Sequence, residues 1–161
     1  MWIRVAAVGD AGDISGMSGA LFREDAGSRD PSVNLDWPEE EGHEYFSALV
    51  SDEDCLCLLA ESEEDVIGYL AGRMKPGDSL RPVRLAVLES MYVREDHRSL
   101  GVGAKLADEF FRWAESKGAE RASVTTYAEN ERAIRFYGNF GFQPRRVSLE
   151  KSLVRSGDPN R

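Results

Sequence analysis

The stretch HRSLGVGAKL, residues 97–106, places one arginine and two closely spaced glycines between an apolar run, residues 84–93, and the start of an amphipathic pattern. Gly101 and Gly103 permit positive φ and close approach of a ligand to the backbone. The first amides of a helix that begins here lack intrahelical partners, so with the helix dipole they can bind an anion such as a phosphate. Arg98 would add a fixed positive charge beside them.

Two common nucleotide-binding motifs do not fit this stretch. A Walker loop has four residues between its glycines and ends in Gly-Lys-Ser/Thr, whereas one residue separates Gly101 from Gly103 and Lys105 stands alone. A dinucleotide fingerprint needs a third glycine where this chain has Leu106. The residues alone leave two alternatives open, an anion site and a tight strand-to-helix turn shaped by glycines.

The elements that position this stretch follow from hydrophobic periodicity, which is two in strands and near four in helices. We expect strands over residues 2–8, 55–61, 66–74, 83–93, 121–127 and 147–153. We expect helices from a cap at Asp10 to residue 24, from Pro38 to Val50, from the glycine stretch to Gly118, and from a cap at Asn130 to Gly141, with a loop over 26–36. This order predicts an α/β fold that contains antiparallel hairpins.

Composition and charge limit the function. The 161 residues carry a formal net charge of −9, which disfavours nucleic-acid binding through a basic surface. No apolar run reaches the ~18 residues of a membrane span, and the N-terminus lacks a signal-peptide pattern, so we expect a cytoplasmic protein without a membrane partner. Cys55 and Cys57 would share one strand face as buried thiols. They and the two histidines, His43 and His97, lack metal-ligand spacing, so no metal site is predicted.

Two motifs resemble the GNAT N-acetyltransferase superfamily. Arg98-x-x-Gly101-x-Gly103, after a strand that ends in MYV, resembles the family's acetyl-CoA-binding motif. The stretch NERAIRFYGNFGF, residues 130–142, is similar to the family's Asn-x-x-Ala-x-x-Phe-Tyr…Gly-Phe signature. The two motifs occur in the order and at the spacing that the family shows. The order of the expected strands and helices along nearly the whole chain is similar to the family's as well.

The resemblance implies a fold and a co-substrate. The fold would be a single GNAT-like domain over residues 1–154 with a polar tail over 155–161, a mixed, mostly antiparallel sheet, helices on both faces, and a V-shaped splay between two central strands, 83–93 and 121–126. Acetyl-CoA would place its pyrophosphate on the glycine stretch and its pantetheine along the first of these strands, like an added strand. The residues implied to bind it are Met91, Tyr92, Val93, Arg98, Ser99, Leu100, Gly101, Val102, Gly103, Ala104, Asn130 and Ala133.

Acetyl transfer to an amine needs a base and an acid. An alkylammonium with a pKa near 10 is only about one part in a thousand neutral at pH 7, a deficit of roughly 4 kcal/mol. Glu89 is the only acid in the run 84–93 and precedes Met91, where the strand should open onto the cleft, so it is the candidate base. The resemblance implies that such a carboxylate works through water, and an ordered water chain without a base is the alternative. The family's Phe-Tyr element implies Tyr137 as the acid for the departing thiolate. A solvated glutamate and a core tyrosine remain the alternatives.

The predicted acceptor is a cationic small molecule, similar to an aminoglycoside or a polyamine. Between Glu24 and Asp65 the chain carries about half of its acids and a single arginine. Some of these carboxylates would attract a cation, unless the segment is only an acidic surface. The candidates are Asp30, Asp36, Glu40 and Glu41. The alternatives are acetylation of protein or peptide N-termini or of amino-acid-like amines, and a non-catalytic acyl-CoA-binding regulator. A homodimer is one option for the assembly.

Overall fold

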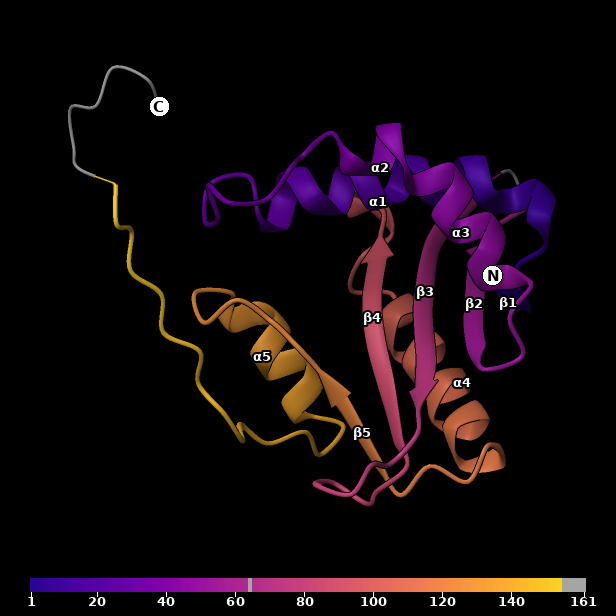
Figure 1. The fold of residues 1–161 in the computed structure, drawn as a ribbon. Helices are drawn as coiled ribbons and strands as arrows, with labels where there is room; N and C mark the ends of the chain where they lie inside the picture. Colours follow the sequence, from indigo (N-terminus) through magenta and orange to yellow (C-terminus); the bar gives the residue numbers. More distant parts are fainter. Residues whose placement is uncertain (64, 155–161) are drawn as a thin grey trace.

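A mixed five-stranded sheet in the order β1-β2-β3-β4-β5 forms the centre of the molecule (Figure 1). The computed structural model describes residues 1–63 and 65–154, so the polar tail predicted over 155–161 lies outside the described residues. β1 to β4 pair antiparallel and β4 pairs with β5 in parallel, which confirms the mixed, mostly antiparallel sheet. The strands are β1 (Trp2–Val5), β2 (Cys55–Glu61), β3 (Val66–Lys75), β4 (Leu85–Val93) and β5 (Arg121–Val124).

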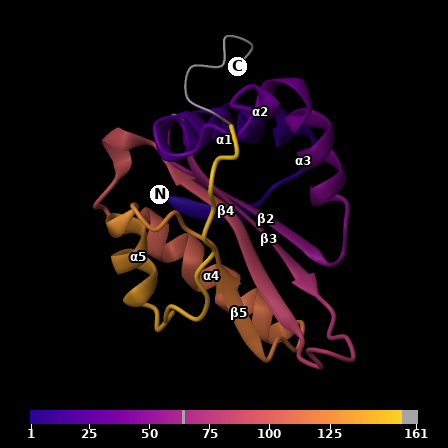
Figure 2. The ribbon, with the colours of Figure 1, turned by 60° about the vertical axis from the view of Figure 1, so that its left-hand side comes forward.

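Helices cover both faces of the sheet, as expected (Figures 1 and 2). One face carries the first three helices and the other carries α4, while α5 lies beside β5. The helices are α1 (Ala11–Asp25), α2 (Trp37–Glu40), α3 (Gly42–Val50), α4 (Val102–Ser116) and α5 (Glu131–Gly138), with two 3-10 helices, η1 (Val8–Asp10) and η2 (Glu95–His97). No helix within residues 1–63 and 65–154 is long and apolar enough to cross a membrane.

The two-sided cover explains why β2 is apolar at successive positions. Leu56 and Leu58 belong to the core between the sheet and α4, whereas Cys57 and Leu59 belong to the core between the sheet and the helices α1 and α3. Cys55 packs on the same side as Cys57, which confirms that the two thiols share one strand face. Burial raises the pKa of Cys57 to about 12, so this thiol is protonated at neutral pH.

The prediction of one continuous helix from Pro38 to Val50 is wrong. The chain breaks at Glu41, with φ −126°, into α2 and α3. A Cβ on Gly42 would lie 2.9 Å from the hydroxyl of Ser15 in α1, so the glycine lets α3 begin close against α1. The break gives α2 and α3 separate directions, and both then pack on α1.

The two ends of the chain also differ from the expectation. The predicted last strand, 147–153, is extended but pairs with no strand among the described residues, and Val147, Leu149 and Leu153 are 81%, 90% and 89% exposed. A segment with alternating apolar residues becomes a strand only when it pairs with a neighbouring strand. No described strand lies beside residues 147–153. β5 therefore lies at the sheet edge and not between two strands. The first strand ends at Val5, where the chain turns into η1.

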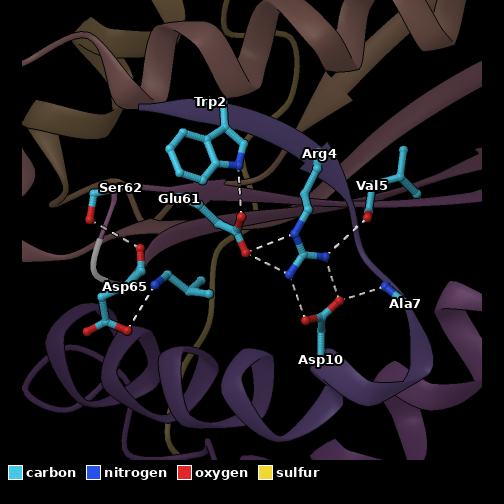
Figure 3. A network of polar contacts seen from close by, with 9 residues as sticks. Trp2, Arg4, Val5, Ala7, Asp10, Glu61, Ser62 and Asp65 are labelled. Carbon is cyan, nitrogen blue, oxygen red and sulfur yellow. Dashed lines mark hydrogen bonds and ion pairs between the residues drawn. The ribbon is translucent and has the colours of Figure 1, made fainter.

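Asp10 does not cap α1 with its side chain, because the carboxylate binds Arg4 (Figure 3). Arg4 donates to Asp10 at 2.8 and 2.9 Å and to Glu61 at 2.9 Å. Trp2 Nε1 donates to the other oxygen of Glu61 at 2.8 Å, so β1, η1 and β2 are tied together. The hydrogen bonds from Arg4 hold the pKa of Asp10 and of Glu61 below their usual range.

We predict that Arg4→Met lowers the Tm by about 2–4 °C at pH 7, as expected for a partly exposed ion-pair network. Because the folded pKa of both carboxyl groups is depressed, their contribution to stability is present above the unfolded pKa, near 4, and is lost as the pH falls through the folded pKa. The difference in Tm between wild type and variant should therefore shrink between about pH 5 and pH 2. Thermal unfolding followed by circular dichroism measures it, and a constant difference would contradict the assignment.

Candidate active site

The glycine stretch forms a loop of unpaired amides between β4 and α4. Ser99 and Gly101 both have positive φ, 63° and 82°, and Gly101 is the N-cap of α4. The amides of residues 99–104 donate to no described group, and the first amide that does is that of Lys105, to the Gly101 carbonyl at 3.1 Å. Several N–H groups at the start of a 15-residue helix thus remain available for an anion.

Arg98 anchors this loop and does not point free at its lip. Its two terminal nitrogens donate to both carboxylate oxygens of Glu24 in α1, at 2.6 and 2.7 Å, and Nε donates to the carbonyl of Val93 at 2.8 Å. The guanidinium also lies over the ring of Tyr92, 5.3 Å from its centroid. Since Glu24 compensates its charge, the backbone amides are the groups of this loop that remain available to an anion.

A bulge in β4 marks the point where the sheet opens. Ala71 of β3 lies opposite Ser90 and Gly72 lies opposite Leu88, so Glu89 is an extra residue without a partner in β3. A bulge bends its strand and increases the local twist. Beyond it, β4 turns away from the strand that follows in the sheet.

β4 and β5 pair over only four residues. Leu85–Leu88 lie beside Arg121–Val124, and β4 then continues to Val93 without β5. The two strands diverge from this pairing, which is the expected splay (Figure 1). The edge of β4 over residues 89–93 therefore faces no strand in the described chain. It is open to an added strand, although the carbonyl of Val93 is already taken by Arg98.

The splay contains a cleft of about 270 Å³. α1 and the turn after it, the open part of β4, the end of β5 and α5 all contribute to its wall. The lining residues are Leu21, Glu24, Asp25, Arg29, Leu88, Glu89, Ser90, Met91, Val124, Thr125, Thr126, Asn130, Arg132, Ala133 and Tyr137. The structure thus brings both candidate catalytic residues to one cleft, together with Met91, Asn130 and Ala133 from the predicted cofactor-binding set.

Glu89 lines the cleft but is not a free carboxylate. One oxygen accepts from Nε of Arg73, and the other accepts from the hydroxyl of Tyr45 at 2.5 Å. Arg73 also donates to the Tyr45 hydroxyl at 3.3 Å, so the three side chains form a closed set. Burial and the Glu89 carboxylate raise the pKa of Tyr45 to about 12, which keeps this phenol a donor. Each oxygen of Glu89 retains a second lone pair that can face the cleft.

Tyr137 has the properties of a proton donor. It is 9% exposed, and burial followed by the charge of Asp25 raises its pKa to about 12, so the phenol is protonated at neutral pH. Its hydroxyl forms no hydrogen bond with any described residue. The group therefore enters the cleft with its proton still available.

Contacts with α1 and α4 position α5, which carries Tyr137. The side chain of Asn130 accepts from the amide of Ala133 at 3.1 Å, which confirms its capping role, and donates to Asp25 at the end of α1 at 2.8 Å. A Cβ on Gly103 would lie 3.3 Å from the ring of Phe136, so this glycine makes room for α5. The two sequence motifs are thus in direct contact.

The candidate acceptor-binding acids are in two different environments. Asp30 accepts hydrogen bonds from Ser32 and Tyr127, which hold its pKa below the usual range, and it belongs to the loop after α1. Asp36 is the N-cap residue of α2, without a side-chain capping bond. Glu40 and Glu41 lie at the end of α2, where each accepts one hydrogen bond from a neutral side chain.

The chain belongs to the acetyltransferase (GNAT) family, whose model matches residues 21–142. Over 57 residues it is 37% identical to the uncharacterized N-acetyltransferase YobR of Bacillus subtilis, a match that covers 35% of this chain and 23% of that protein. Over 90 residues it is 32% identical to the acetyl transferase GW6a of Oryza sativa, covering 52% of this chain and 22% of that protein. The chain thus spans less than a quarter of the length of either relative.

A solved structure with the same fold is the aminoglycoside antibiotic 6'-N-acetyltransferase AAC(6')-IG of Acinetobacter haemolyticus. It superposes with a TM-score of 0.73 over 96% of this chain and 100% of that chain, at 20% sequence identity. This agreement confirms the GNAT-like α/β fold.

Sequence reasoning missed the partners of the candidate residues. Glu24, Tyr45 and Arg73 carry no motif, and they reach Arg98 and Glu89 only through the fold. The one signal available was that Glu89 sits alone in an apolar strand, since a lone carboxylate there needs a partner.

Proposed function

We propose that this protein is an acetyl-CoA-dependent N-acetyltransferase that moves the acetyl group to a primary amine by direct attack in a ternary complex. One observation carries the proposal: a loop of unpaired amides at the end of β4 adjoins an open strand edge and a cleft lined by Glu89 and Tyr137. The amides of Ser99 to Ala104 would hold the pyrophosphate, and the edge of β4 near Met91 would hold the pantetheine.

Acetyl-CoA supplies an activated acyl group, whose C–S bond breaks as the amine nitrogen bonds to the carbonyl carbon. Tyr137 would give its proton to the leaving sulfur and would regain one from the nitrogen, which loses its second proton as the amide forms. The raised pKa of Tyr137 keeps the phenol protonated before the transfer. Glu89 would receive the ammonium proton through water on the lone pairs that Arg73 and Tyr45 leave free. These two roles remain predictions that mutagenesis can test.

The proposed acceptor is a cationic small molecule. Support comes from the acidic end of α2, where Glu40 and Glu41 accept hydrogen bonds from neutral side chains only. The structural neighbour named above is an aminoglycoside acetyltransferase, which is in line with this class. We further propose that the activity resides in one domain over residues 1–154 and takes place in the cytoplasm.

A panel of amines incubated with acetyl-CoA tests the activity. Release of free thiol with polyamines or aminoglycosides supports the proposal, and kcat/KM for them should fall as salt rises from about 0.05 to 0.5 M, because the Debye length shortens about threefold. Turnover of neutral amines or peptides alone, without salt dependence, would favour the other acceptor class. Failure to bind acetyl-CoA would contradict the enzyme assignment.

We also propose a homodimer. Among residues 1–63 and 65–154, neither the segment 147–153 nor the outer edge of β5 has a strand partner, so two copies can pair them reciprocally around a two-fold axis. The exposed side chains of Val147, Leu149 and Leu153 would then be covered. Light scattering should give twice the chain mass for wild type and a monomer for Leu149→Asp. A wild-type monomer at all concentrations would exclude this assembly.

A further inference from the structure

An aromatic groove lies next to the cleft, and Tyr45 separates the two. Phe22, Val33, Asn34, Trp37 and Tyr45 line an open groove of about 400 Å³, and its lining is almost entirely apolar. Trp37 stacks on Phe22 with ring centroids 5.9 Å apart and meets Tyr45 edge-on at 5.2 Å. The Tyr45 hydroxyl binds Glu89, which belongs to the wall of the cleft. Tyr45 therefore belongs to the groove lining and also contacts the cleft wall through Glu89.

Two carboxylates contact side chains of the groove lining. Glu41 accepts from Nε1 of Trp37 at 2.9 Å, and Glu40 accepts from Nδ2 of Asn34 at 3.1 Å. Both donors are neutral, so they orient the carboxylates without compensating their charge. In contrast, Glu89 is paired with Arg73. The uncompensated negative charge therefore lies beside Asn34 and Trp37 of the groove lining, whereas the charge of Glu89 in the cleft wall is compensated.

The polar atoms of the groove are already occupied. Trp37 Nε1 and the Tyr45 hydroxyl donate to Glu41 and Glu89, while Asn34 donates to Glu40 and accepts from the amide of Asp36 at 3.0 Å. The hydroxyl groups of a sugar ring placed on these aromatic side chains would lose water and find no free partner among the lining side chains. A methylene chain has no such cost, and its ammonium ends favour aromatic faces and carboxylates.

We propose that the acceptor is a linear aliphatic diamine or polyamine. This proposal rests on the acetyltransferase function proposed above and narrows the class of its acceptor substrate. The methylene chain lies along Trp37 and Tyr45, the distal ammonium binds Glu40 and Glu41, and the reacting amine enters the cleft beside Glu89. The distance between the two charged ends then selects the length of the acceptor.

Binding measured by calorimetry tests the proposal independently of catalysis. The probes are 1,4-diaminobutane, 1,6-diaminohexane, 1,8-diaminooctane, the monoamine hexylamine and the aminoglycoside kanamycin. We expect one diamine to bind at least tenfold more tightly than hexylamine, and each methylene buried up to the best length to strengthen binding by about two- to fourfold. A monoamine that binds as tightly as every diamine would overturn the proposal.

Matched variants separate the two carboxylates from the general acidity of the surface. The double variant Glu40→Gln/Glu41→Gln should weaken diamine binding about tenfold and leave hexylamine unchanged. Glu39→Gln/Glu44→Gln removes the same charge from exposed positions nearby and should change neither by more than about twofold. Equal losses in both double variants would attribute the attraction to the overall field. Trp37→Leu should weaken both ligands, with the Tm recorded to verify folding.

The outcomes also distinguish this proposal from the proposed function. If kanamycin is acetylated and no diamine binds, the proposed acetyltransferase activity is supported and the diamine acceptor is excluded. If diamines bind in a manner that depends on Glu40 and Glu41 but the protein binds no acetyl-CoA, the groove is supported as a diamine-binding site and the acetyltransferase activity is excluded.

Discussion

Replacing Tyr137 by phenylalanine should lower kcat for acetyl transfer by roughly 10²-fold or more, with the Kd for acetyl-CoA nearly unchanged. The substitution removes one hydroxyl and little volume. That hydroxyl contacts no described hydrogen-bonding partner, so its loss breaks no described hydrogen bond of the fold. If the phenol protonates the leaving sulfur, the loss appears in the chemical step. Steady-state kinetics with a saturating amine, combined with calorimetry for acetyl-CoA, measure both quantities.

Tyr127→Phe is the matched control. Tyr127 is also a tyrosine with a pKa raised to about 12, but its hydroxyl donates to Asp30 at 2.7 Å and it does not line the cleft. We expect this variant to retain kcat within about threefold. An unchanged kcat for Tyr137→Phe, in an enzyme whose single-turnover rate equals its steady-state rate, would show that Tyr137 is only a core residue.

The pH dependence follows from the same group. Because the pKa of Tyr137 is raised to about 12, its protonated form persists through the range in which an alkylamine loses its proton, near pH 10. The rate with an alkylamine should therefore rise with pH up to about 10, without a falling limb from the phenol below that value. A descending limb with an apparent pKa near 8 would show that the acid is another group.

The sequence predicted what depends on local pattern. The apolar runs of β2, β3 and β4 and the amphipathic face of α4 were correctly predicted because burial on both sides of a sheet leaves a strong periodic signal. The lone acid in the apolar run 84–93 indicated Glu89, and the second motif indicated Tyr137; the fold places both in one cleft. Their chemical roles remain predictions.

What the sequence missed depends on contacts between distant residues. Tyr45 and Arg73 reach Glu89 from 44 and 16 residues away, and Glu24 reaches Arg98 from 74. No local pattern contains such a pair. The strand predicted over 147–153 was wrong for a related reason. The alternation of apolar residues indicates a strand, but whether another strand lies beside it depends on the rest of the fold.

The same contacts change the choice of variant for the cofactor loop. A side chain at Gly103 would press on Phe136, so loss of acetyl-CoA binding there would be confounded with displacement of α5. Leu100 is 69% exposed and lies among the unpaired amides. A charge at this position tests the loop without disturbing the core.

Leu100→Glu should therefore raise the Kd for acetyl-CoA by about tenfold or more. A carboxylate ~6 Å from one phosphate charge, at an effective dielectric constant near 40, opposes binding by about 1.4 kcal/mol. The measurement is the rise in Tm with acetyl-CoA, which follows occupancy by mass action. Leu100→Gln has the same length without the charge and should keep the wild-type shift, while both variants keep the Tm of the free protein. If Leu100→Glu binds acetyl-CoA like wild type in low salt, the pyrophosphate does not lie on the amides of residues 99–104. The proposal that the pantetheine binds along the open edge of β4 would then be contradicted too, because it depends on that position of the pyrophosphate.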